Sequence, residues 1–317
     1  MPGLGGWAAG LPGPDPTAYP EPSEPRGAPE GPGRKPISAG ATGARGLFLL
    51  PVAKSPSNLS PRVNVLGVGI STLNRESAVR LVVEAVQRRQ RGYICVTGVH
   101  GVMESHDDEH VRAIHNRALL VTPDGMPMVW LGKLQGHREM SRVYGPDLML
   151  DVCEASGPPG LRHFFYGGAN GAAEELRRCL TGRFPGLQVV GTFEPPFRPL
   201  DPQEERSLVQ QVEAAAPDIL WVGLSTPKQE KFMAEYLPKL KATLMLGVGA
   251  AFDFHAGRAP QAPAWMQRSG LEWFYRLCRE PRRLWKRYLG NNPRFVCLAA
   301  AQLLGLRKYS LEEIPPG

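Results

Sequence analysis

The stretch GVGAAFDFHAGRAPQAPAWMQRSGLEWFYRLCREPRRLWKRY, residues 247–288, divides the chain into two kinds of sequence. It begins like the end of a buried strand that runs into a glycine-rich turn, and it ends as a basic helix. Between these parts, tryptophans, arginines and prolines are unusually dense. A buried core segment does not need this mixture, whereas a site that binds a polyanion close to a membrane surface does.

Upstream of this stretch, predicted strands and helices alternate along the chain. Apolar runs of strand length recur at residues 62–70, 93–100, 119–125, 162–166, 187–191, 218–223 and 243–247. Helical patterns lie between them at residues 75–89, with Asn74 as the N-cap, and at 102–118, 126–134, 145–155, 169–181, 202–215 and 227–237. This alternation predicts a Rossmann-like α/β fold, in which helices flank a mainly parallel sheet.

Two other regions frame this α/β domain, which we expect to cover residues 61–257. After residue 257 the alternation stops, and helices are predicted at 271–279 and 281–306, so residues 258–317 form a basic, aromatic helical appendage. Residues 1–60 contain 12 Pro and 11 Gly. A segment of this composition cannot bury enough apolar surface to order itself, so we expect a disordered tail, either a solvated arm or a protein-binding one.

The charge of the chain is concentrated in the appendage. The whole chain carries a net charge of +7, whereas residues 258–308 contain eleven Lys and Arg against two acids. Such a local excess indicates a site for anions rather than a general polycation. Five widely spaced cysteines without a CxxC pair argue against a disulfide framework or a zinc site, and no apolar run reaches the roughly 18 residues of a membrane span. The start of the chain also lacks a signal-peptide pattern, so we expect a cytoplasmic protein.

Ligands in parallel α/β sheets bind beyond the carboxyl ends of the strands, and several polar or glycine positions follow predicted strands here. Gly167 and Gly168 lie between a strand and a helix, where they form either a phosphate-binding turn or simply a tight turn. Asp124 follows another strand and is either a general base or the cap of the next helix, which the residues alone favour. Asp253 lies after the last strand, in a context without a second metal-binding aspartate.

Other candidates come from helix starts. Gln229 and Glu230 begin a helix, either as ordinary helix-start residues capped by Thr226 or as groups that recognise a sugar or nucleotide. Arg142 precedes a helix and pairs either with phosphate or with a neighbouring carboxylate. Three histidines lack metal-ligand spacing, so we expect hydrogen-bonded structural roles for them, namely His100, His163 and His255. Neither a metal ion nor a cofactor is expected.

The aromatic and basic residues of the appendage leave three alternatives open. They fit a surface for single-stranded nucleic acid, a helix lying on anionic lipid, or a packed helix with a solvated basic face. Arg276, Arg279, Arg283 and Arg287 are spaced by three or four residues and share one helix face, as a diphosphate site would need.

Taken together, the motifs TPDGMPMVW, SRVYGPDLM, FFYGGANGAAEEL, PDILWVGLSTPKQEKFM and GVGAAFDFHAGRAPQAPAWMQRSGLEWFYRLCREPRR resemble the WecG/TagA/CpsF family of glycosyltransferases. The resemblance runs in family order over residues 63–294. It implies an inverting, metal-independent enzyme that transfers a sugar, commonly of the N-acetylmannosamine type, from a UDP-sugar to a polyprenyl-diphosphate-linked acceptor. It also implies work at the inner face of the cell membrane, in surface-polysaccharide or cell-wall biosynthesis.

The resemblance also suggests roles for individual residues. It implies that Asp124 is the catalytic base, with Thr97, Arg142 and Gln229 beside it in the cleft. Substrate-binding residues are expected at Gly167, Gly168, Glu230, Asp253, Arg276, Arg279, Arg282, Arg283 and Arg287. The sequence departs from many relatives after Thr97, where GVHG replaces a run containing Asn.

Two rival functions follow from the same residues. A nucleic-acid-binding module would use the basic aromatic appendage and bind single strands in a salt-sensitive manner. A dehydrogenase of similar fold is disfavoured because no GxGxxG motif with an acidic partner is present.

Overall fold

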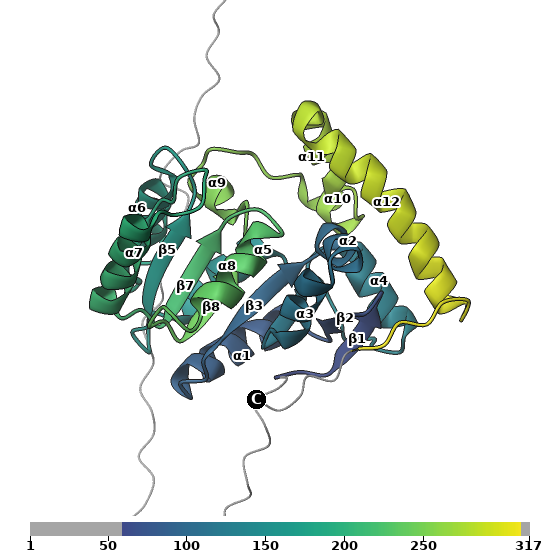
Figure 1. The fold of residues 1–317 in the computed structure, drawn as a ribbon, viewed down its shortest axis with the longest axis horizontal. Helices are drawn as coiled ribbons and strands as arrows, with labels where there is room; N and C mark the ends of the chain where they lie inside the picture. The colour runs from purple at the N-terminus through teal and green to yellow at the C-terminus, as the bar shows by residue number, and fades with distance from the viewer. Residues whose placement is uncertain (1–58, 312–317) are drawn as a thin grey trace, which may run out of the picture. The chain divides into compact units, whose positions relative to one another are not determined.

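The structure, a computed structural model, describes residues 59–311 (Figure 1). The tail predicted over residues 1–60 therefore lies almost entirely outside the described residues. Within residues 59–311, no helix is both long enough and apolar enough to cross a membrane.

The core of the described region is a parallel sheet of six strands. The strands lie in the order β4-β3-β8-β7-β5-β6, and every neighbouring pair is parallel. This arrangement confirms the predicted α/β fold class. The strands are β3 (Gly92–Thr97), β4 (Leu120–Pro123), β5 (Arg162–Gly167), β6 (Gln188–Phe193), β7 (Ile219–Gly223) and β8 (Leu244–Gly247).

Helices cover both faces of this sheet. One apolar cluster packs β-strand residues such as Ile94 against one set of helices, and a second cluster packs alternate residues such as Cys95 against the other set. The first set is α1 (Arg75–Gln87), α5 (Gly145–Ala155), α6 (Ala172–Arg183) and α9 (Ala251–His255). The second set is α2 (Val99–Asp107), α3 (Glu109–Arg117), α7 (Pro202–Ala215) and α8 (Lys228–Tyr236).

Several helix boundaries agree with the sequence prediction. α5 and α7 have the predicted bounds, as does α4 (Met126–Leu134). Asn74 caps α1, because its side chain accepts a hydrogen bond from the backbone N–H of Ser77.

Two predictions are wrong, because a predicted single strand and a predicted single helix are each two elements in the structure. Residues 62–70, predicted as one strand, form an antiparallel hairpin of β1 (Arg62–Val65) and β2 (Val68–Ser71). Leu66 and Gly67 both have positive φ, which reverses the chain in two residues. The helix predicted over 102–118 is divided at Asp108, which ends α2 and caps α3 through its side chain.

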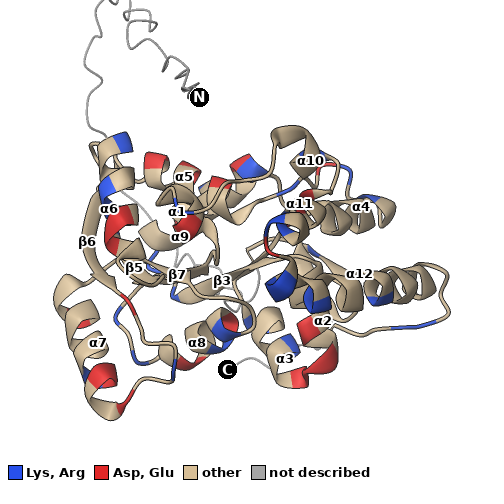
Figure 2. Cartoon of the chain, turned by 90° about the horizontal axis from the view of Figure 1, so that it is seen from above, with Lys and Arg blue, Asp and Glu red and all other residues tan. Residues whose placement is uncertain are grey.

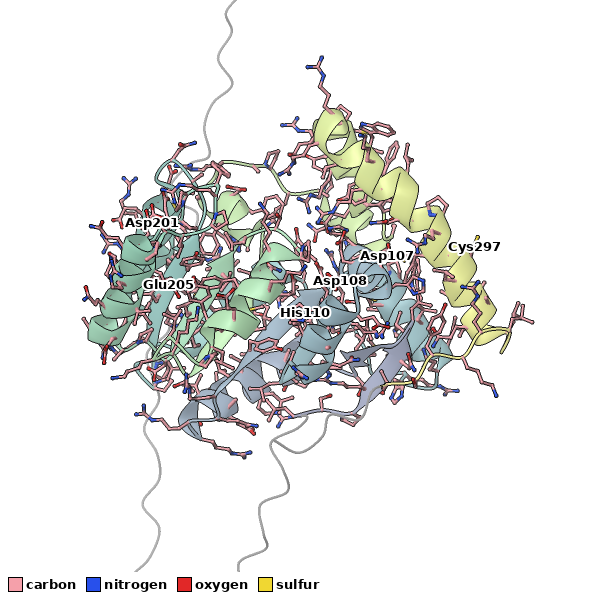
Figure 3. All side chains as sticks on the ribbon, in the orientation of Figure 1. Asp107, Asp108, His110, Asp201, Glu205 and Cys297 are labelled. Carbon is pink, nitrogen blue, oxygen red and sulfur yellow. The ribbon has the colours of Figure 1, made fainter. Side chains whose placement is uncertain are left out.

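The appendage consists of α10 (Ala264–Arg268), which was not predicted, α11 (Glu272–Arg279) and α12 (Pro281–Leu303). α12 crosses α2 and reaches the β1–β2 hairpin (Figure 1). There the side-chain amide of Gln302 accepts a hydrogen bond from Leu66 N at 2.9 Å and donates one to Asn64 O at 2.9 Å. Arg294 on α12 also pairs with Asp107 at the end of α2. Figure 3 labels Asp107. These contacts attach the appendage to the sheet domain.

Candidate active site

A cavity of about 1810 Å³ opens at the carboxyl edge of the sheet. Its walls come from the loops that follow β3, β4, β5, β7 and β8, and from the appendage helices α11 and α12. Parallel strands present their carboxyl ends at one edge, so loops far apart in sequence meet there. The location predicted for the site is therefore the location of the cavity.

The structure brings most of the predicted site residues together at this cavity. Thr97, Gly167 and Glu230 lie directly beside lining residues without belonging to the lining, and Arg279 and Arg282 lie exposed outside it. The predicted residues that line the cavity are Asp124, Arg142, Gly168, Gln229, Asp253, Arg276, Arg283 and Arg287.

Asp124 lies between β4 and α4, where its backbone N–H donates to the carbonyl of Thr97 at 2.9 Å. Gly98 allows this close approach, because a Cβ at that position would lie 2.5 Å from the Asp124 carbonyl oxygen. The residues alone favoured Asp124 as the cap of the next helix, and this interpretation is wrong. Gly125 is the N-cap of α4, and no side chain caps that helix. The carboxylate of Asp124 instead faces the cavity.

The surroundings of Asp124 hold its pKa at about 6, above its ordinary value of 3.8. Burial is the main cause, Arg142 opposes the rise, and Glu272 adds to it. The side chain is 32% exposed, but the solvent that reaches it lies inside the cavity. A carboxyl group with this pKa can accept a proton from a bound substrate near neutral pH.

Arg142 connects Asp124 to the appendage. Its guanidinium lies 3.7 Å from Asp124 Oδ1, pairs with Glu272 of α11, and donates to Gln267 Oε1 of α10 at 3.2 Å. The same guanidinium stacks on the ring of Tyr144, 4.0 Å from its centroid. Of the two roles left open for Arg142, the structure therefore shows a carboxylate ion pair that reaches across the cavity wall.

His100 makes a second contact between the sheet domain and the appendage. Its Nε2 lies 3.3 Å from Thr226 O, and its Nδ1 lies 3.2 Å from Asn291 Nδ2 of α12. Burial, reinforced by nearby Arg287, lowers the pKa of His100 to about 3, so the ring is neutral. A neutral ring that donates through Nε2 and accepts through Nδ1 satisfies both contacts, and the predicted hydrogen-bonded structural role is confirmed.

The start of α8 supplies a compact polar group. Thr226 was expected to cap this helix, but Pro227 is the N-cap, and the Thr226 hydroxyl donates to Glu230 Oε1 at 3.0 Å. Gln229 Nε2 donates to the same oxygen at 3.0 Å. Within residues 59–311, the buried oxygens at this edge without a hydrogen-bond partner include Gln229 Oε1, Glu230 Oε2 and Thr97 Oγ1. Such atoms are expected where a polar ligand binds.

At the glycine turn after β5, two N–H groups at the start of α6 are already hydrogen-bonded. Gly167 packs against the backbone of Gly223, where a Cβ would lie 2.6 Å from the carbonyl oxygen, so the need for glycine is steric. The carboxylate of Glu194 accepts hydrogen bonds from Gly171 N and Ala173 N at the start of α6, both at 2.9 Å. An acidic side chain thus already fills the position predicted for an anion.

Three arginines of the appendage face the cavity at the start of α12 and the end of α11. Figure 2 shows Lys and Arg gathered where these helices meet. Arg283 pairs with Glu280 at 2.5 Å, whereas Arg276 and Arg287 make no ion pair within the described part of the chain. Burial lowers the pKa of Arg287, and neighbouring Arg276 and Arg283 lower it further. Cations held this close together favour a bound anion.

Sequence reasoning missed Glu272, Gln267 and Tyr144, which surround Arg142. The only sequence signal for Glu272 is that it is one of two acids among the many cations of residues 258–308. Within residues 59–311, no group of three or more His, Cys, Asp or Glu side chains is placed to hold a metal ion.

Similarity to known proteins covers both the sheet domain and the appendage. A relative from Bacillus spizizenii, named N-acetylglucosaminyldiphosphoundecaprenol N-acetyl-beta-D-mannosaminyltransferase, is 30% identical over 193 residues, which are 61% of this chain and 72% of the relative. A protein of the same name from Bacillus subtilis (strain 168) is 32% identical over 170 residues, or 53% of this chain and 64% of the relative. The model of the glycosyl transferase WecG/TagA/CpsF family matches residues 63–309. The chain therefore belongs to the glycosyl transferase WecG/TagA/CpsF family.

Proposed function

We propose that this chain transfers an N-acetylmannosamine-type sugar from a UDP-sugar to an acceptor linked to polyprenyl diphosphate, with inversion at the anomeric carbon. The observation that carries the proposal is Asp124, whose pKa is about 6 and whose carboxyl group shares a cavity with the arginines of α11 and α12. The two Bacillus relatives carry names that describe this kind of transfer.

Asp124 acts as the general base in this proposal. It takes the proton from the acceptor hydroxyl, and the oxygen attacks the anomeric carbon from the face opposite UDP. The C–O bond to the diphosphate breaks as the new glycosidic bond forms, so the configuration inverts. A base with a pKa near 6 binds the proton more strongly than an ordinary aspartate and is still ionised at neutral pH.

Arg276, Arg283 and Arg287 balance the negative charge that develops on the leaving diphosphate. Guanidinium groups bind phosphate oxygens through two parallel hydrogen bonds, and their attraction strengthens as the leaving group gains charge. Arg279 and Arg282 lie outside the cavity and have no part in this step.

The donor binds at the sheet edge in this proposal. Gly168 lets the nucleotide approach the backbone after β5, while Gln229 and Asp253 contact its sugar. Thr97 and Glu230 each have a buried oxygen without a partner in the described region, and they position the Asp124 loop and Gln229. Gly167 supports Gly168 through its contact with Gly223.

The appendage also brings the enzyme to the lipid in this proposal, at the inner face of the cell membrane. Trp265, Phe274 and Trp285 are about half exposed, with arginines near them. Aromatic side chains interleaved with cations bind the surface of an anionic membrane. Residues 61–257 are then the catalytic domain, and residues 258–317 are the part that meets the membrane.

Nothing in the site favours a nucleic-acid-binding module. Arg276 and Arg287 face the cavity, and Arg258 and Arg294 are paired with Glu175 and Asp107. These four basic residues are thus not available as one open strip for a nucleic-acid backbone.

A panel of UDP-sugars, offered with undecaprenyl-diphosphate N-acetylglucosamine, tests the proposal. Mass spectrometry should show addition of one N-acetylhexosamine from the UDP-N-acetylmannosamine reaction, and NMR should show an anomeric configuration opposite to that of the donor. The absence of any product with every donor, or retention of configuration, would contradict the proposal.

A further inference from the structure

The cavity does not end at the arginines. It continues as a groove between α4 and α12, here called the α4–α12 groove. One wall is made by Met126, Trp130 and Leu134 of α4, and the other by Leu289, Val296 and Leu303 of α12. The two helices lie side by side in Figures 1 and 2.

The α4–α12 groove is mainly apolar, with Asn292 as a polar lining residue of α12. Between Tyr288 and Leu303, Arg294 is the only charged residue of α12, and it is turned away to pair with Asp107 of α2. Lys133 is the only charged residue of α4, and it does not line the groove. Leu134 and Val296 are 70% and 63% exposed. Apolar surface left open in this way usually marks a binding site.

Polarity changes from one end of α12 to the other. Its first two turns carry Arg282, Arg283, Lys286 and Arg287, whereas its later turns present apolar side chains to the groove every three or four residues. The helical rise places Leu303 roughly 24 Å beyond Arg287. The helix is thus built to bind a molecule with an anionic head and a long apolar tail.

The far end of the groove is held at a fixed width. The carbonyl of Asn64 in β1 accepts hydrogen bonds from Gln135 at the end of α4, at 3.1 Å, and from Gln302 near the end of α12, at 2.9 Å. At the near end, Gly270 lies against Trp130, where a Cβ would be 3.0 Å from the ring. The shared carbonyl therefore fixes the spacing of α4 and α12 at the far end, and at the near end the turn between α10 and α11 packs against α4.

We propose that the α4–α12 groove binds the isoprenoid tail of the acceptor lipid, starting from the isoprene unit next to the diphosphate. This inference rests on the proposed function. The argument for this occupant is continuity, because the groove begins at Arg287 and Tyr288, which line the same cavity as Asp124. The arginines hold the leaving UDP in the proposed function, so only the acceptor's tail is assigned to the groove. An acceptor with its sugar hydroxyl at Asp124 has that tail at the mouth of the groove.

Two matched variants test the proposal. Ala300→Trp places an indole in the groove, where Ala300 is exposed on the lining face of α12. Gly290→Trp adds the same ring to the same helix outside the groove, where a Cβ would meet nothing within 4 Å. Each protein is assayed with N-acetylglucosamine diphosphate that carries either an undecaprenyl chain or an ethyl group.

We expect Ala300→Trp to lower kcat/KM for the undecaprenyl acceptor by about tenfold or more, since the ring displaces several buried methyl-sized groups. The kcat/KM of Ala300→Trp for the ethyl acceptor should equal that of the wild type. Gly290→Trp should leave kcat/KM unchanged for both acceptors. An unchanged undecaprenyl value in Ala300→Trp, or an equal loss with both acceptors, would overturn the groove as the tail site.

Photolabelling separates this inference from the proposed function, because it needs no sugar transfer. A farnesyl diphosphate analogue with a diazirine at the end of its tail should label peptides that contain residues 126–134 and 289–303 of the full chain. Labelling confined to other peptides, or no labelling because another segment or a second copy covers the groove, would overturn the inference. If the groove is labelled but no donor is used by the wild-type protein, only the proposed function fails.

Discussion

Arg142, in the loop before α5, forms an ion pair with Glu272 at the start of α11, and the same guanidinium lies 3.7 Å from Asp124 Oδ1. The appendage therefore contributes to the electrostatics of the proposed base as well as to the cavity wall. Glu272 raises the pKa of Asp124, whereas Arg142 lowers it. The position of α11 and the basicity of Asp124 are thus coupled through one arginine.

Glu272→Gln should lower the pKa of Asp124, because it removes a nearby negative charge and leaves Arg142 to act on Asp124 alone. The acid limb of the kcat/KM profile should move to lower pH. Glu280→Gln is the control, because Glu280 pairs with Arg283 instead. Identical pH profiles for Glu272→Gln and the wild-type enzyme would contradict the coupling.

Asp124→Asn should lower kcat by roughly a hundredfold to ten-thousandfold, as expected for loss of a general base. Binding of the UDP-sugar, measured by calorimetry, should persist because the fold and the arginines are kept. In the wild-type enzyme, kcat/KM should rise as the pH passes through about 6, where Asp124 ionises. Undiminished turnover in Asp124→Asn would exclude Asp124 as the base.

The contribution of Asp124 to the stability of the folded protein should fall as the pH rises, whereas its contribution to kcat/KM should increase. The pKa of about 6 in the folded protein lies above the ordinary 3.8, so the folded state binds the proton more tightly than the unfolded state does. Its stabilising contribution is complete below pH 3.8 and is lost as the pH rises through 6. The Tm of Asp124→Asn relative to the wild type should therefore be higher at pH 8 than at pH 5. A Tm difference that does not change with pH would contradict the raised pKa.

Asn291→Ala removes the hydrogen bond between α12 and His100 and should destabilise the docked appendage by about 0.5–1.5 kcal/mol. Hydrogen exchange should become faster in the first half of α12. Asn292→Ala is the control, since the Asn292 side chain makes no hydrogen bond in the described part of the chain. Equal exchange rates in the two variants would show that His100 does not hold α12.

Gly98→Ala should lower kcat/KM while leaving the protein folded. The added Cβ would lie 2.5 Å from the Asp124 carbonyl oxygen, so the loop that carries Asp124 must move. Gly182→Ala is the control, because its Cβ would meet nothing within 4 Å and α6 gains a better helix former. The control should keep full activity with a slightly higher Tm, and full activity in Gly98→Ala would show that the loop tolerates the shift.

The fold was predictable because each strand and helix has a local signal. Apolar runs and capping residues such as Asn74 act within one element, and parallel strands then place Asp124 and Gln229 at one edge without further information. The division of the predicted strand 62–70 and of the predicted helix 102–118 was missed because in each case a single residue marks the break. Asp108 ends one helix and begins another, and Gly67 turns a hairpin that lacks the usual Asn-Gly or Asp-Gly pair.

The polar pairings of the site were not predictable from local patterns. Arg142 and Glu272 are 130 residues apart, and nothing in either neighbourhood specifies the other. Glu194 likewise occupies the start of α6 from a different loop. The cluster of cations in the appendage predicts an anion site, and this stays a prediction. Charge counting could not show that Arg258 and Arg294 are used to attach the appendage to the sheet domain.

The attachment of α12 to the hairpin has a consequence for the newly made chain. Gln302 contacts Leu66 and Asn64, which leave the ribosome 236 and 238 residues earlier. At about 5–20 residues per second, the hairpin and the loop of Asp124 are exposed for many seconds before α12 is made. A nascent chain therefore contains Asp124 before it contains the arginines of α11 and α12, and before α12 completes the α4–α12 groove. In the proposed mechanism, which needs these arginines, catalysis begins only after α12 has been made.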